Sequence, residues 1–293
     1  MKYAFLDAWL LSRLTDERVA AGLNRLLHER ELVPALTGLS FVELYNPGWQ
    51  RALGTERGEA AVAFLANFPC VFADPTDIYA AEYDAFPAPL GVMPVRLDLG
   101  AFAPEVRSEV LMAFLRRGDL LKRFDVDAER FADTYKRIKE DWVAQATAVV
   151  DAVLDDVGVK RRPDGSVRID AGDREVALLS LDLRLVDDPD TDNYLLRAMT
   201  ASGHRARFMR GARTTSLAMW HLYAPPNAAE RPAQRSSDIG DIHHLSLAPY
   251  CQMFTADGTM HRLLCRIAAE VGLDEARLYS PATLMPLLVA APS

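Results

Sequence analysis

Two short apolar stretches, one near each end of the chain, are each followed by an aspartate. Residues 3–6 precede Asp7, and residues 251–256 precede Asp257. Each stretch has the length and composition of a buried β-strand, and functional groups gather at the carboxyl ends of strands in open parallel sheets. Carboxylates brought together there repel each other unless a cation holds them. Because Mg²⁺ and Mn²⁺ prefer oxygen ligands, the two aspartates predict a divalent-metal site.

Three further acids extend this candidate centre. Asp238 and Asp241 are three positions apart and share one face of the helix predicted for residues 238–248. Glu43 lies in an apolar helical segment, where an unpaired carboxylate is costly to bury. Each acid taken alone is compatible with a helix cap, a turn or a solvated face. Their order and context together favour one acidic centre that also includes Asp7 and Asp257.

The elements that must position these acids follow a strand–helix–strand pattern. Strands are predicted at residues 3–7, 32–36, 68–73, 251–256 and 277–279, and helices at 16–30, 37–45, 238–248, 259–270 and from Ser280 onward. This alternation indicates an α/β fold with a central, mostly parallel sheet. Residues 85–234 have a different, mostly helical texture. The simplest organisation is one α/β domain made of residues 1–84 and 235–293, interrupted by that helical insertion.

These residues resemble the PIN domain superfamily of nucleases. Phe5-Leu6-Asp7 is similar to the family's opening strand and first acid, and Phe41-Val42-Glu43-Leu44 to its Glu-bearing helix. The Asp238–His244 segment resembles the helix with the third acid, and Phe254 to Asp257 the strand end with the fourth. Ala256 separates Thr255 from Asp257, whereas several relatives have Thr or Ser directly before the acid.

The resemblance implies a three-layer α/β/α fold and a metal-dependent hydrolase that cleaves phosphodiester bonds, of RNA rather than DNA. Asp7 would have a central or bridging role, Asp241 and Asp257 would bind Mg²⁺ or Mn²⁺, and Glu43 and Asp238 would be ligands or outer-shell groups. A role as a ribonuclease toxin of a toxin–antitoxin pair follows at the family level only. A homo-oligomer or an inhibitor protein is compatible with the same resemblance.

A basic segment is the strongest feature within residues 85–234. Arg205, Arg207, Arg210 and Arg213, with Phe208 between them, either bind a nucleic-acid backbone or form a solvated helix face that balances the acids at 187–192. His243 and His244 are interpreted as a helix face with one packed and one solvated ring, a proton donor or a phosphate contact being the alternative. Glu82 is a further carboxylate that could reach the acidic centre.

Bulk composition narrows the classes of protein. The chain has 293 residues, a net charge of −8 and three cysteines without a CxxC pair, which argues against a broad nucleic-acid-coating surface and against zinc. Neither a membrane span nor a secretory signal is expected, so a cytoplasmic location is predicted. Two alternatives stay open. One is a catalytically inactive PIN-like scaffold that binds proteins through the insertion, and the other is a phosphatase on another α/β fold. Asp7-Ala8-Trp9 lacks the Asp-x-Asp pair of the commonest phosphatases.

Overall fold

A computed structural model shows a parallel sheet enclosed by helices. It describes residues 1–37, 40, 56–73, 75–85, 105–106, 128–186, 209–226 and 238–290. The strands in this part of the chain form one sheet in the order β4-β3-β2-β1-β5-β6. Five of them run parallel and β4 is antiparallel at one edge. Their bounds are β1 Lys2–Phe5, β2 Leu32–Leu36, β3 Cys70–Phe72, β4 Glu105–Val106, β5 Met253–Thr255 and β6 Leu278–Tyr279.

The central strand β1 lies where the strand order changes direction. From β1 the chain adds β2 and β3 on one side, and much later β5 and β6 on the other. Phe5 pairs with Ala35 of β2 and with Phe254 of β5. The carboxyl ends of β1 and β5 therefore flank the topological switch point of the sheet, which is the usual position of a ligand crevice in open α/β sheets.

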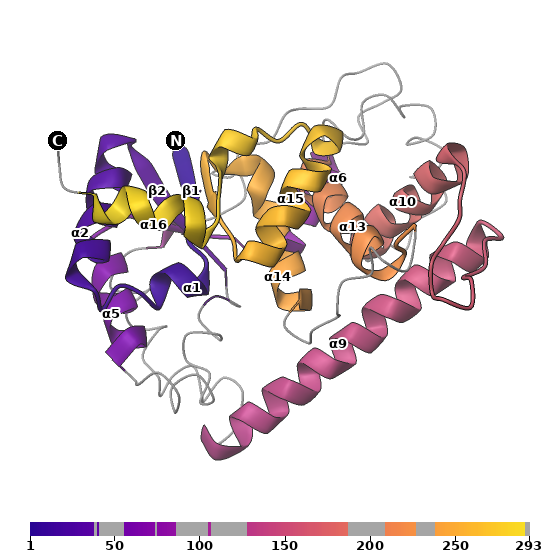
Figure 1. Cartoon of the computed structure of the whole chain (residues 1–293), viewed down its shortest axis with the longest axis horizontal. Helices are drawn as coiled ribbons and strands as arrows, with labels where there is room; N and C mark the ends of the chain where they lie inside the picture. Colours follow the sequence, from indigo (N-terminus) through magenta and orange to yellow (C-terminus); the bar gives the residue numbers. More distant parts are fainter. Residues whose placement is uncertain are drawn as a thin grey trace.

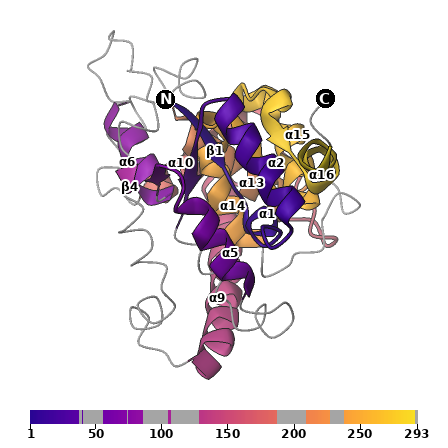
Figure 2. The same cartoon turned by 90° about the vertical axis from the view of Figure 1, so that its left-hand side faces the viewer.

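One face of the sheet is covered by helices close to the chain ends. They are α1 (Ala8–Leu11), α2 (Glu17–Glu29), α5 (Glu56–Leu65) and α16 (Pro281–Val289), at the left of Figure 1 and in front in Figure 2. Because successive strand residues point to opposite faces, Ala4 and Leu6 enter this core. In α2, Asp16 caps the first turn, and the buried residues recur every three or four positions.

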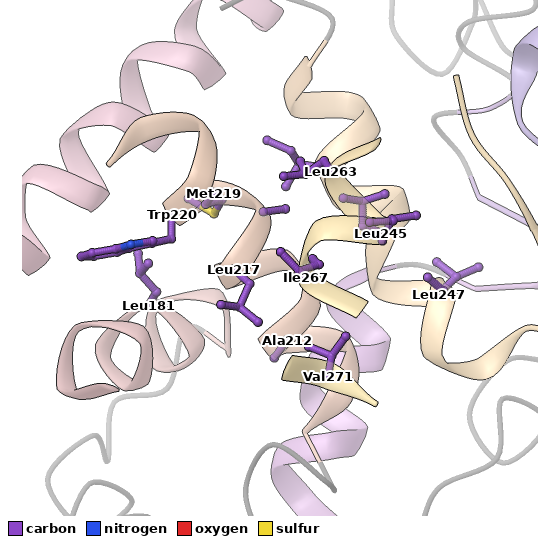
Figure 3. Packing of buried hydrophobic residues seen from close by; sticks show 14 of the residues in the cluster. Leu181, Ala212, Leu217, Met219, Trp220, Leu245, Leu247, Leu263, Ile267 and Val271 are labelled. Carbon is purple, nitrogen blue, oxygen red and sulfur yellow. The ribbon is translucent and has the colours of Figure 1, made fainter. Parts of the chain in front are cut away.

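The opposite face receives Tyr3, Phe5 and Phe254. It is covered by α6 (Pro75–Ala85), α13 (Arg210–Tyr223), α14 (Asp238–His244), the 3₁₀ helix η3 (Leu245–Tyr250) and α15 (Gly258–Val271). Figure 3 shows side chains of α13, η3 and α15 packed together, among them Leu217, Leu245 and Ile267. Almost all of α13 is buried, so it is a core helix of the fold. The architecture is thus three-layered, α/β/α.

Two helices between residues 85 and 234 join the same core. The long helix α9 (Ala128–Asp156) runs along the molecule in Figure 1, and α10 (Ala171–Val186) packs against α9 and α13. Val150, Val153 and Leu181 belong to the hydrophobic cluster that contains Phe5. Within the described residues, this interval consists mainly of α9, α10 and α13. The domain boundaries at 84 and 235 stay predictions.

The helix α5 was not predicted from sequence, and two further elements differ from the predicted ones. The helix predicted for residues 238–248 ends at His244 and continues as η3, which contains Pro249. Proline has no N–H to donate and disfavours α geometry in the residue before it, so the tighter 3₁₀ turn replaces the α-helix. The short strand β4 falls in a stretch predicted to be mostly helical. None of the described helices has the length and apolarity needed to cross a membrane.

Candidate functional site

Asp7 and Asp257 lie at the carboxyl ends of two adjacent parallel strands. Asp7 follows β1 and is the N-cap residue of α1, and Asp257 follows β5 and is the N-cap residue of α15. Both residues are half-buried. The register of Phe5 with Phe254 brings the two strand ends to the same edge of the sheet. The placement of both acids at strand ends, as the sequence predicts, is confirmed.

Thr255 fastens the two strand ends to each other. Its buried hydroxyl donates to the carbonyl oxygen of Phe5 at 3.0 Å and accepts from the backbone N–H of Asp7 at 2.7 Å. These bonds continue the β1–β5 ladder by one step with a side chain. They fix the backbone of Asp7 relative to the strand that leads to Asp257. Thr255 therefore acts through its contacts with β1, as a support for Asp7.

The Asp257 carboxylate caps α15 with one oxygen. Its Oδ1 accepts the backbone N–H groups of Thr259 at 2.7 Å and Met260 at 2.8 Å. Within the described residues, Oδ2 has no hydrogen-bond partner. Asp7 differs, since its side chain makes no capping bond to α1. Asp257 thus combines a structural bond on one oxygen with a second oxygen that can serve as a ligand.

The third acid with a described side chain, Asp241, lies on α14 and is half-buried. His244, one turn further along, is buried and contacts Thr37, the residue directly after β2. The end of α14 is therefore attached to the same edge of the sheet. Asp238 belongs to α14 by its backbone, but its side chain lies outside the description, as does the whole of Glu43. Of the two predicted histidine positions, His244 is the packed one and His243 is half-buried.

The described part of the chain holds no group of three or more His, Cys, Asp or Glu side chains that could bind a metal ion together. Mg²⁺ in proteins is commonly held by one or two carboxylates, with waters and substrate phosphates completing its octahedron. Asp7 and Asp257 fit that mode, because they sit at one sheet edge and Oδ2 of Asp257 is left over by its helix cap. The donor set is all oxygen, which suits Mg²⁺ or Mn²⁺.

Two of the four arginines predicted to bind nucleic acid make structural contacts. Arg213 is 4% exposed, and its guanidinium pairs with Glu175 and, at 3.9 Å, with the buried Asp182. Arg210 donates to the backbone oxygens of Pro249 at 3.2 Å and Gly272 at 3.0 Å. The Arg213 guanidinium is enclosed by the protein, so the prediction for this residue is wrong, whereas for the half-buried Arg210 it stays a prediction. Arg205 and Arg207 lie outside the described residues.

Glu82 is a buried carboxylate whose role the sequence did not reveal. It is 1% exposed, and its two oxygens accept the backbone N–H groups of Gly211 at 2.6 Å and Ala212 at 2.9 Å. The hydroxyl of Tyr250 donates to it as well. Burial raises the pKa of Glu82 to about 7, against the opposing effect of these three donors. Glu82 therefore caps α13 from α6 and ties both helices to η3.

Gly211 is the residue in the sequence that reflects the close contact between Glu82 of α6 and the start of α13. A Cβ at this position would lie 2.8 Å from the Ile78 side chain and 3.1 Å from Glu82 Oε1. Only glycine lets α6 approach the start of α13 so closely. The sequence shows a glycine within an arginine-rich segment, but not that its partner is a glutamate on a distant helix.

The cysteines offer no nucleophile at this edge. Cys70, Cys251 and Cys265 are all free thiols. Burial raises the pKa of Cys70 and of Cys251 to about 12, so neither is a thiolate near neutral pH. Both side chains are buried.

Comparison with protein-family models, with curated proteins and with solved structures finds no match for this chain. The geometry at the carboxyl ends of β1 and β5 therefore carries the functional argument, together with the resemblance of the motifs.

Proposed function

We propose that the chain is a PIN-like, metal-dependent nuclease whose centre lies at the carboxyl ends of β1 and β5. The observation that carries this proposal is the position of Asp7 and Asp257 after two adjacent parallel strands at the switch point of the sheet. Two negative charges at one sheet edge repel each other unless a cation compensates them. A divalent cation would do so, and it would direct the chemistry toward phosphate esters.

Asp7 and Asp257 would hold the ion, and Asp241 would complete or support the set. A bound divalent ion supplies a water of lowered pKa and stabilises the charge that develops on the phosphoryl oxygens. Thr255 keeps the backbone of Asp7 in place during this work, through its bonds to Phe5 and Asp7. The cap on α15 restricts the rotation of the Asp257 carboxylate, so its Oδ2 is presented in one direction.

RNA is the proposed substrate on the strength of the PIN resemblance. Because Arg213 is buried and pairs with Glu175 and Asp182, a phosphate backbone must be contacted by other residues. The net charge of −8 favours a focused contact near the acidic edge over a broad basic surface.

The test is cleavage of single-stranded and structured RNA and DNA with Mn²⁺, with Mg²⁺ and with EDTA. Asp7→Asn and Asp257→Asn remove one charge each with little change of shape. Asp274→Asn is the matched control, because Asp274 also caps a helix with its Oδ1 but precedes β6. We expect metal-dependent cleavage that falls at least about a hundredfold in the first two variants and is kept in the control.

Equal cleavage by wild type and both variants would refute the assignment of these aspartates. A folded wild type without cleavage, and without any change in melting temperature on adding Mn²⁺, would favour the catalytically inactive scaffold. Hydrolysis of small phosphate esters without cleavage of either polymer would favour the phosphatase.

A further inference from the structure

A buried polar cluster lies next to the acidic edge. Thr37 directly follows β2, and its hydroxyl lies 3.0 Å from Nδ1 of His244 and 3.2 Å from the hydroxyl of Ser40. The backbone N–H of Ser40 also donates to the Thr37 hydroxyl, at 3.3 Å. All three residues are buried. Either tautomer of the imidazole can make the bond to Thr37, since a hydroxyl both donates and accepts.

The imidazole of His244 also packs on the central strand. Its ring centroid lies 5.1 Å from that of Phe5, at an interplanar angle of 37°. Phe5 itself stacks on Phe254 of β5 at 4.7 Å. His244 therefore contacts β1 two residues before Asp7 and, through Thr37, the end of β2. One side chain of α14 thus reaches two of the strand ends beside the proposed metal centre.

The helix that carries His244 depends on tertiary contacts for its position. α14 spans seven residues and leads into a 3₁₀ helix, and a helix this short is not stable without tertiary contacts. Asp241 and His244 are three positions apart, so they project from the same side of α14. Fixing the His244 ring therefore also fixes the direction in which Asp241 points.

We propose that Thr37 and His244 are positioning residues for Asp241. Their buried hydrogen bond holds α14 against the carboxyl ends of β1 and β2, and so fixes the helix from which Asp241 projects. This inference rests on the proposed nuclease function. Hydrogen bonds from outside the ligand set orient metal-binding groups, and their loss commonly costs 10–100-fold in metal affinity or activity.

Conservative and disruptive substitutions can be paired at both positions. The amide of asparagine reaches the place of Nδ1, whereas the amide of glutamine reaches that of Nε2. Because Thr37 contacts Nδ1, His244→Asn keeps the bond and His244→Gln loses it, although both remove the ring. Thr37→Ser keeps the hydroxyl and Thr37→Val loses it. Thr214→Val is the matched control, since this buried hydroxyl donates only within α13, to the carbonyl of Arg210.

The experiment measures cleavage of RNA against Mn²⁺ concentration, together with amide hydrogen exchange of peptides covering α14. Thr37→Val and His244→Gln should lower kcat about tenfold or more and raise the Mn²⁺ concentration needed for half-maximal rate. Exchange in α14 should be faster in both. Exchange in α14 should stay close to wild type in three variants: Thr37→Ser, His244→Asn and Thr214→Val. The Mn²⁺ dependence of cleavage should also stay close to wild type in Thr37→Ser and Thr214→Val.

The proposal is overturned if Thr37→Val and His244→Gln are folded and show wild-type exchange in α14 and wild-type Mn²⁺ dependence. It is also overturned if His244→Asn and His244→Gln are equally impaired, since only the ring would then matter. That comparison decides the question even if Thr37→Val does not fold. If the wild type cleaves no RNA but exchange in α14 is still faster in Thr37→Val and His244→Gln, the Thr37–His244 bond holds α14 as proposed. Only the nuclease function is then refuted.

Discussion

Asp257 has a structural and a proposed catalytic role that different substitutions separate. Its Oδ1 accepts two backbone N–H groups at the start of α15. We expect Asp257→Ala to lower the free energy of unfolding by about 1 kcal/mol, the usual cost of removing a helix N-cap. Asp257→Asn keeps an acceptor oxygen and should lose less than half of that. Urea denaturation of the three proteins checks this prediction, and an equal loss in both variants would contradict it.

Glu82 should make stability depend on pH. Its pKa rises from 4.5 to about 7 on folding because of burial, so between these values the folded state binds a proton that the unfolded state has lost. The free energy of unfolding should therefore fall as pH rises through this window and level off above about pH 7. A shift of this size corresponds to about 3 kcal/mol.

Glu82→Gln removes this titration. The variant starts from lower stability, because an amide presents N–H groups where the carboxylate accepts from Gly211 and Ala212. Its unfolding free energy should nevertheless lack the decline between pH 5 and 7. Urea denaturation of both proteins at pH 5, 6, 7 and 8 measures the difference. Parallel curves across this range would mean that Glu82 does not carry the dependence.

Single residues were predictable from sequence where their signals are local. Asp7 and Asp257 each follow an apolar run directly, and the run itself is the evidence for the strand end. The partners of Arg213 are Glu175 and Asp182 on another helix. No residue close to Arg213 in the sequence indicates this pairing. The same holds for Glu82 and its contact with Gly211. Ion pairs and caps between distant segments depend on packing that periodicity does not encode.

The helix pair α2 and α16 depends on one glycine. A Cβ at Gly22 would lie 2.0 Å from the backbone oxygen of Leu288 and 2.8 Å from its Cα, so α16 would have to move. We expect Gly22→Ala to cost about 1–3 kcal/mol of unfolding free energy, despite the higher helix propensity of alanine.

Gly172 in the first turn of α10 is the matched control for that substitution. Its Cβ would meet only the Asp170 carboxylate, at an ordinary 3.4 Å, so Gly172→Ala should be neutral or slightly stabilising. Thermal or urea denaturation of both variants tests the pair. A Gly22→Ala protein as stable as Gly172→Ala would show that α16 is free to shift on α2.

Elements with capping signals were predicted closely. Ser280 and Pro281 start α16, and Ser280 with Thr283 forms a reciprocal cap. The strands β1, β2, β5 and β6 also match their apolar runs. The change from α14 to η3 has a local cause in Pro249 that the longer predicted helix overlooked. The pairing of β4 with β3 has no local cause, because an edge strand of two residues is defined by its neighbour.

At the level of the whole molecule, the interval predicted as an insertion supplies part of the central core. Residues of α9, α10 and α13 share one hydrophobic cluster with Phe5 and Phe254 of the sheet. We expect a chain in which a short Gly/Ser linker replaces residues 85–234 to lose cooperative unfolding, because the core on one face of the sheet would lack α9, α10 and α13.

Chemical denaturation, with binding of a hydrophobic dye, tests that deletion against the full chain. We expect a broad transition and strong dye binding, as in compact states without fixed packing. A sharp transition with little dye binding would show that residues 1–84 and 235–293 fold alone, which would agree with the boundaries predicted from sequence.

The hydrogen bond from the Asp7 backbone N–H to the Thr255 hydroxyl joins residues 248 positions apart. This separation affects when the site can form during synthesis of the chain. A ribosome that adds roughly 5–20 residues per second needs about 12–50 s to travel from one to the other. Until then β1 lacks one of its two neighbours, and Asp7 has no second carboxylate beside it. If the chain cuts RNA, the growing polypeptide cannot do so before residues 253–257 have been made, because until then the proposed cutting site has only one of its two aspartates.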